Sequence, residues 1–417
     1  MNMPTKKIAI GEWTFIHLNV TQFLGALNDQ VYKWLLVYLL IDLKGPEYAN
    51  TILAISGAVF VIPFVVFSSV CGKLADNHSK TYILRLSKFL EIVIMALGVA
   101  AFYVQNEWVC YGVLFLMAAQ STLFSPAKYG ILPELFEDNH IPAANGWLSL
   151  FTNVAIIMGA FLASWIAEVT GKNFILAGYI CIGLAVIGTI TSLYIPKSAS
   201  AKQNKRLHLS FWREVLRTLK LTQSIPYLTS VILGNAFFYV IAGYCQLNVI
   251  AYALVDMHES ELMGGYLSPA MAIGIGIGSL LAGKLSKGTT RLDFIWKGAL
   301  AVGLCFGLLQ LTSHSILLTF LALMLLGICG GFYIVPTDSY VQLNTPIEHR
   351  GEMIGSSNVL AFTGVMLGSL LISLLGDGFS LTPKEGFAVV GFLSAILALV
   401  LYRLIGSYSS QIGRLKE

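Results

Sequence analysis

Residues 72–85 read GKLADNHSKTYILR, a charged stretch set between two long apolar runs, 51–72 and 85–105. Apolar runs of this length are long enough to cross a bilayer as helices. The basic residues of the stretch, with the one that follows a turn later, are Lys73, Lys80, Arg85 and Lys88. The stretch therefore predicts a basic loop between two membrane-spanning helices.

The same alternation continues along the chain. Of its 417 residues 56% are hydrophobic and 12% are charged, which is about half the charged fraction of a typical soluble domain. Runs of this kind satisfy their own backbone in lipid only as helices. The predicted spans are 14–41, 51–72, 85–105, 108–132, 141–168, 174–195, 226–254, 264–284, 293–312, 315–340, 353–376 and 386–406.

The placement of basic residues gives the topology. Lys and Arg gather in alternate loops, and the other loops hold only Lys44, Lys172 and Lys384. Basic loops remain in the cytoplasm, so both termini are predicted to be cytoplasmic. The net charge of +4 is thereby explained without nucleic acid, which we do not expect as a partner; membrane lipids are the expected surroundings.

Residues 196–222 interrupt the apolar pattern. They are polar and basic at first, and a short amphipathic stretch follows from Phe211. We interpret this stretch as an interfacial helix on the anionic inner leaflet, which is compatible with a solubilising linker. The predicted domains are an N-terminal six-helix bundle at 1–195, a cytoplasmic linker with an amphipathic helix at 196–222, and a C-terminal six-helix bundle at 223–417.

The two halves repeat each other. GKL at 72–74 recurs at 283–285, and GAFLAS at 159–164 recurs loosely as GSLLIS at 368–373. Pro126 recurs as Pro336 at nearly the same offset. The predicted fold class is an all-α membrane protein with twelve transmembrane helices in two six-helix halves, the parallel repeat of a rocker-type transporter.

GKLADNHSKTYILR resembles the signature between helices 2 and 3 of the major facilitator superfamily. The resemblance implies that Gly72 allows a close helix approach. It also implies that Asp76 accepts from backbone N–H groups at a neighbouring helix start. The copy in the second half, GKLSKGTTR, lacks the Asp. We expect both residues to act in a conformational gate.

The stretches TQFLGALNDQVYK, SPAKYGILPELF and GGFYIVPTDSYVQ are similar to the lysophospholipid transporter family, above all to the transporter half of fusions with acyltransferase and acyl-carrier-protein ligase domains. This resemblance implies a multi-pass protein of the bacterial inner membrane. It would move lysophosphatidylethanolamine to the inner leaflet for re-acylation, with a separate acyltransferase or acyl-carrier-protein synthetase as a partner. Gln246 and Leu367 stand where stand-alone members have Arg and Glu, which leaves head-group preference open.

The first span carries a polar stripe. Asn19, Gln22, Asp29 and Lys33 follow one another at helical steps, and such residues are costly at membrane depth. We expect Asp29 to contact the cationic part of a zwitterionic head group, and Lys33 to hold a phosphate or to extend to the interface. An internal i,i+4 pair of Asp29 with Lys33 is the alternative.

The seventh span carries neutral hydrogen-bonding groups at Asn235, Tyr239 and Gln246. We expect these side chains to form the second wall of the substrate site. Hydrogen bonds between helices would explain them equally well.

Two further charged positions are candidates for conformational roles. Lys128 and Asp338 follow Pro126 and Pro336 at equivalent places in the two halves, which predicts a cytoplasmic gate pair. The alternative is that Lys128 extends to lipid phosphates while Asp338 is hydrated locally. Glu91, grouped with the conformational residues, follows Lys88 at i,i+3 and favours a local ion pair over proton coupling.

Catalytic chemistry is not indicated. No His is followed five residues later by Asp, no G-x-S-x-G turn occurs, and neither the seven His nor the six Cys residues have metal-ligand spacing. We expect a non-enzymatic protein without metal or cofactor. Two rival functions remain: an exporter of a drug or siderophore, although 153–164 lacks G-P-x-x-G-G, and a membrane platform for an acyltransferase, although a platform needs no buried Asp.

Overall fold

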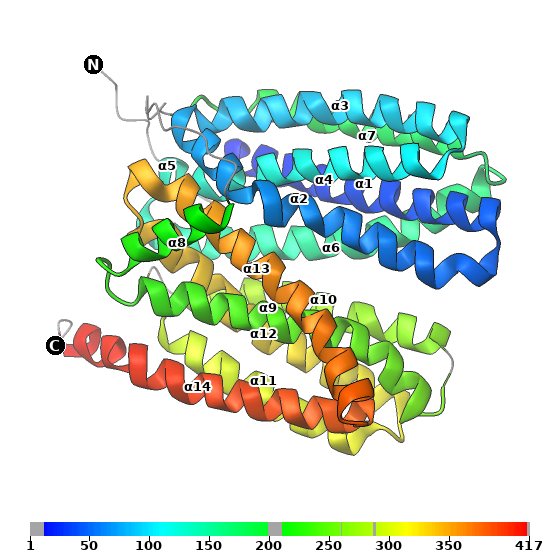
Figure 1. Ribbon diagram of the computed structural model, residues 1–417. Helices are drawn as coiled ribbons and strands as arrows, with labels where there is room; N and C mark the ends of the chain where they lie inside the picture. Colours follow the sequence, from blue (N-terminus) through cyan, green and yellow to red (C-terminus); the bar gives the residue numbers. More distant parts are fainter. Residues whose placement is uncertain (1–11, 199–210, 260, 287–288, 415–417) are drawn as a thin grey trace. The chain divides into compact units, whose positions relative to one another are not determined.

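The computed structural model describes residues 12–198, 211–259, 261–286 and 289–414, which form helices joined by short turns, with no strand among them (Figure 1). The helices of the N-terminal part are α1 (Trp13–Lys44), α2 (Ala49–Asn77), α3 (Lys80–Val104), α4 (Glu107–Gly130), α5 (Leu132–Leu135), α6 (Ile141–Val169) and α7 (Phe174–Leu193). Those that follow are α8 (Phe211–Thr222), α9 (Leu228–Val255), α10 (Glu261–Leu285), α11 (Asp293–Thr312), α12 (Ile316–Asn344), α13 (Arg350–Ser373) and α14 (Pro383–Arg414).

Each predicted span coincides with one of the long helices. In the described part of the chain, ten helices are long and apolar enough to cross a membrane. They are α2, α4, α6, α7 and α9 to α14. The remaining two predicted spans, α1 and α3, are the helices that carry Asp29 and Glu91. The all-α membrane class is therefore confirmed.

Polar side chains mark several helix ends. Asn106 accepts from the backbone N–H groups of Trp108 and Val109 at the start of α4, at 3.0 and 3.2 Å. Arg85 donates to the carbonyl groups of Leu193 and Ile195 at the end of α7, at 2.8 and 2.7 Å. These contacts satisfy backbone groups that a helix leaves open at its ends.

By contacts, the chain falls into two units. Unit 1 comprises residues 1–137, 154–215 and 346–359, and unit 2 comprises 138–153, 216–345 and 360–417. Three helices, α6, α8 and α13, contribute residues to both units, and the predicted domain bounds stay a prediction. The linker stays a prediction in part, because 199–210 lie outside the described residues. The amphipathic segment forms α8, with Arg213 and Lys220 exposed.

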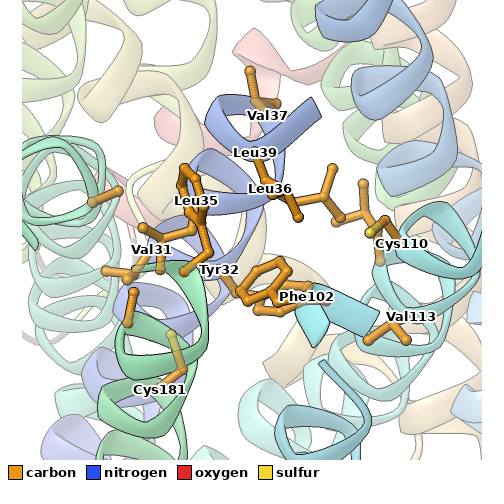
Figure 2. Packing of buried hydrophobic residues seen from close by; sticks show 14 of the residues in the cluster. Val31, Tyr32, Leu35, Leu36, Val37, Leu39, Phe102, Cys110, Val113 and Cys181 are labelled. Carbon is orange, nitrogen blue, oxygen red and sulfur yellow. The ribbon is translucent and has the colours of Figure 1, made fainter. Parts of the chain in front are cut away.

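Unit 1 has its core around α1. Tyr32 of α1 stacks on Phe102 of α3 with ring centroids 5.1 Å apart, and Leu35 and Leu36 lie buried beside them (Figure 2). Gly98 leaves the space for Tyr32, since an added Cβ would lie 2.5 Å from its ring. This packing fixes the face of α1 on which the polar stripe lies.

Unit 2 is packed closely through glycines. An added Cβ at Gly274 would lie 2.1 Å from the carbonyl oxygen of Met324, and one at Gly278 would lie 2.1 Å from that of Ile328. Contacts this short require α10 and α12 to touch backbone to backbone.

The sequence repeat is also a repeat of contacts. In unit 1, Gly159 of α6 lies against the carbonyl of Leu27 in α1. In unit 2 the equivalent residue, Gly368 of α13, lies against the carbonyl of Val240 in α9. Glycines at equivalent positions therefore allow equivalent pairs of helices to pack closely, α6 with α1 and α13 with α9.

Candidate functional site

The polar stripe of α1 lies largely inside unit 1. Asn19, Gln22 and Asp29 are buried, and Lys33 is half-buried. The Asn19 amide donates to the carbonyl of Phe15 at 3.0 Å, within its own helix. The amide nitrogen of Asn19 is thus occupied locally, whereas its Oδ1 is buried without a partner among the described residues. Asp29 and Lys33 are the charged members of the stripe.

Within the described ranges Asp29 has one hydrogen-bond partner. Ser121 of α4 donates its hydroxyl to Asp29 Oδ2 at 2.5 Å. The other oxygen, Oδ1, is buried and has no partner among the described residues. A buried carboxylate oxygen without a hydrogen bond destabilises the protein when no ligand is bound. A ligand that donates a hydrogen bond to this oxygen would remove that cost.

Lys33 does not pair with Asp29 in the described part of the chain. Its Nζ lies over the ring of Phe60 of α2, 5.2 Å from the centroid, and 5.7 Å from that of Trp34. Aromatic faces attract a cation without neutralising it. The i,i+4 alternative is therefore not the arrangement observed, and the two charges stay separate one helical turn apart.

Glu91 forms the local pair that its spacing favours. Its carboxylate pairs with Lys88 and accepts from the Asn28 amide at 2.9 Å. Both charged side chains are almost fully buried, and Gly25 and Gly188 leave room for the end of Lys88. The ion-pair partner of Lys88 is therefore Glu91 and not Asp29. A gating role for Glu91 stays a prediction.

Asp76 makes the contact that the sequence analysis expects. Its carboxylate is fully buried and accepts from the backbone N–H groups of Gly351 and Glu352, at 2.6 and 3.0 Å. These groups belong to the first turn of α13, where a negative charge is favoured. Gly72 allows the approach, since an added Cβ would lie 2.2 Å from the carbonyl oxygen of Gly351.

The segment SPAKYGILPEL holds a buried ion pair that the sequence analysis missed. Glu134 of α5 lies 2.6 Å from the Nζ of Lys80, which begins α3, and both side chains are buried. Gly130 makes room for the stem of Lys80, because an added Cβ would lie 3.0 Å from Lys80 Cε. In the sequence, this pair is visible only as two residues of opposite charge, Lys80 and Glu134, that both lie outside the predicted spans.

Lys128 faces the stripe of α1. Its Nζ donates to Gln22 Oε1 at 3.4 Å and lies over the Tyr129 ring, 4.5 Å from the centroid. Pro126 lies inside α4 and Pro336 inside α12. Asp338 is half-buried and belongs to unit 2, whereas Lys128 belongs to unit 1. A gate pair of Lys128 with Asp338 stays a prediction.

The predicted wall on α9 is divided by burial. Asn235 is buried and its Oδ1 has no partner among the described residues, Tyr239 is half-buried, and Gln246 is exposed. Asn248, which the sequence analysis did not select, is buried and donates to the carbonyl of Pro383 at 2.9 Å. Of the three residues predicted on α9, Asn235 is therefore the one with a buried acceptor that has no hydrogen bond among the described residues.

No group of three or more His, Cys, Asp or Glu side chains in the described ranges could hold a metal ion. Two charged groups of α1 are not joined in an ion pair. One buried carboxylate oxygen is unpaired, and one ammonium lies over aromatic rings, a turn away on the same helix. A ligand carrying both a cation and an anion would complement the two groups.

Comparison with known proteins places this geometry in context. A family model described as Major Facilitator Superfamily matches residues 18–295 and 232–416. "Lysophospholipid transporter LplT" of Escherichia coli O1:K1 is 27% identical over 401 residues, covering 92% of this chain and 93% of the relative. The protein of that name from Shigella sonnei is 28% identical over 399 residues, with the same shares covered.

Solved structures agree on the fold. The human organic anion transporter MFSD10 superposes with a TM-score of 0.77 at 12% identity, covering 93% of this chain and 99% of that one. A bacterial homologue of the iron transporter ferroportin gives a TM-score of 0.73 at 16% identity, covering 95% and 99%. Identities this low carry the fold alone, whereas the sequence relatives confirm the resemblance to lysophospholipid transporters.

Proposed function

Because this chain belongs to the Major Facilitator Superfamily and is a multi-pass membrane transporter, we propose that its substrate is a lysophospholipid of the lysophosphatidylethanolamine type. The observation that carries the proposal is the similarity to lysophospholipid transporters over 92% of the chain. The motifs that first suggested the family are spread over both halves.

The charged groups of α1 support a zwitterionic head group. Asp29 Oδ1 is the acceptor available to the ammonium of ethanolamine, and the Lys33 ammonium is available to the phosphate. Each contact is charge-assisted and therefore stronger than a neutral hydrogen bond. Asn235 and Tyr239 of α9 are proposed as neutral partners of the same substrate, with Gln246 as an exposed polar residue of that helix.

Transport would follow alternating access and deliver lysophospholipid to the inner leaflet of the bacterial inner membrane, where a separate acyltransferase or acyl-carrier-protein synthetase would re-acylate it. This direction, membrane and partner are inferred from the family resemblance. Neither Asp29 nor Lys33 would be chemically changed, so the transport step is binding and release.

Reconstituted protein tests the proposal. Proteoliposomes with fluorescent lysophosphatidylethanolamine in one leaflet should show transfer that exceeds protein-free vesicles, and Asp29→Asn should lower its rate at low substrate about 10- to 100-fold, as expected for one contact to a charged group. Asp42→Asn is the matched control, because Asp42 forms an exposed ion pair with Lys172. Transfer of a cationic drug but not of lysophospholipid would favour the exporter, and transfer of neither would favour the platform.

A further inference from the structure

Asp29 differs from the other buried carboxylates of unit 1. In the described residues Glu91 has Lys88, Glu134 has Lys80, Glu352 has His349, and Asp76 has two backbone N–H groups. Asp29 has only the Ser121 hydroxyl. The charged groups that act on it are Glu91 and Lys88 of α3 and Lys33 of its own helix. What fixes its carboxylate is therefore a single neutral donor from α4.

The local chemistry directs that donor to Asp29. Ser121 Oγ lies 2.5 Å from Asp29 Oδ2 and 3.3 Å from Gln120 Oε1. A hydroxyl has one hydrogen to donate, and the charged, nearer oxygen is the better acceptor. Gln120 cannot turn its amide nitrogen toward Ser121 without losing its bond to the carbonyl of Ser87, at 2.9 Å. Ser121 therefore donates to Asp29.

We propose that Ser121 is a positioning residue for the head-group ammonium: by occupying Asp29 Oδ2 it fixes the carboxylate so that Oδ1 alone is presented to the ligand. The inference rests on the proposed function and deepens it. Without the hydroxyl, the carboxylate can turn about its terminal torsion, which is broad for Asp. Binding of the head-group ammonium would then have to fix the orientation of the Asp29 carboxylate, and the lost conformational freedom would lower the affinity.

The test compares two substrates. In proteoliposomes, Ser121→Ala should raise the apparent KM for lysophosphatidylethanolamine about tenfold with the maximal rate within about twofold, the size expected for one lost hydrogen bond to a charged group. The KM for lysophosphatidylglycerol, which has no ammonium, should stay unchanged. Ser121→Thr, which keeps the hydroxyl, should restore the first KM, and Asp29→Asn/Ser121→Ala should be no worse than Asp29→Asn.

Ser69→Ala is the matched control, because Ser69 of α2 is a buried serine whose hydroxyl has no partner among the described residues. If Asp29→Asn raises the KM and Ser121→Ala does not, the positioning role is wrong and the head-group contact stands. If Ser121→Ala raises both KM values alike, or lowers the melting temperature without changing their ratio, its role is structural and the inference is overturned. If Asp29→Asn has no effect, the proposed contact of Asp29 itself fails, and the inference with it.

Discussion

Replacing Asp76 by Asn should loosen the start of α13 from α2. The carboxylate accepts two backbone N–H groups, at 2.6 and 3.0 Å, in a fully buried place. An amide keeps one acceptor oxygen, and its nitrogen would face the second N–H, donor against donor. Hydrogen bonds to a charged group contribute about 1.5–3 kcal/mol each, so the substitution should cost about 2–3 kcal/mol. This corresponds to a shift of about 30- to 150-fold in the equilibrium between closed and separated helix ends.

Cysteine accessibility measures this equilibrium. Ser68 of α2 is buried, and its carbonyl lies beside Gly355 of α13, whose added Cβ would be 2.2 Å from that oxygen. In a protein whose six native cysteines are replaced by serine, Ser68→Cys should react slowly with a maleimide. Adding Asp76→Asn should increase the labelling rate by the same factor as the shift in the equilibrium between closed and separated helix ends. This holds when the labelling rate is proportional to the fraction of molecules with separated ends.

Asp42→Asn provides the control, since it removes an exposed carboxylate of the same unit. It should leave the labelling of the Cys introduced at Ser68 unchanged. Equal labelling rates for Asp76→Asn and its parent, with equal melting temperatures, would show that the two hydrogen bonds do not hold α13 to α2, and the reasoning from the geometry would be refuted.

Other predictions concern charged groups. Lys80→Met should lower the free energy of unfolding in detergent by about 3–5 kcal/mol, because Glu134 stays buried without its cation. Lys80→Met/Glu134→Leu should recover most of that stability. A lower melting temperature for the double variant than for Lys80→Met would contradict the prediction. Asp29→Asn/Lys33→Gln should transport no better than Asp29→Asn, because the two charges are not paired in the structure; recovered uptake would mean that they only neutralise each other. Lys128→Asp and the reverse change at its predicted gate partner, Asp338→Lys, should each raise cytoplasmic-side labelling, and the double swap should lower it again; additive labelling argues against a pair.

The helices could be predicted closely, because an apolar run of spanning length has few other structures open to it in lipid. The first-turn contact of Asp76 was also accessible, since a signature motif implied it. The i,i+3 spacing also favoured the pair of Glu91 with Lys88. The partners of Asp29 and Glu134, which come from other helices, could not be predicted. Ser121, which meets Asp29 from a position 92 residues away, is an ordinary serine in an apolar helix. Its contact depends on the rotation and register of α1 against α4, and no periodic pattern encodes these.

The polar stripes show the same limit. Helical steps correctly grouped Asn19, Gln22 and Asp29 as buried neighbours on α1. Helical spacing alone does not predict that Asp29 and Lys33 stay unpaired, because the position of the Lys33 ammonium depends on the Phe60 ring of α2. Nor could they separate buried Asn235 from exposed Gln246 on α9.

The division of α13 between the units bears on how the protein is made. Unit 1 needs residues 346–359, yet a ribosome reaches them about two hundred residues after finishing the first part of that unit, roughly 10–40 s later at usual rates of synthesis. During that interval the Asp76 carboxylate has no helix start to cap. The first six predicted spans are therefore made before this contact can form, and a fragment released before residue 346 would lack the Gly351 and Glu352 N–H groups that donate to Asp76. Such a fragment should be a preferred substrate of membrane proteases, and we expect unit 1 to reach its final packing only after residues 346–359 have been made.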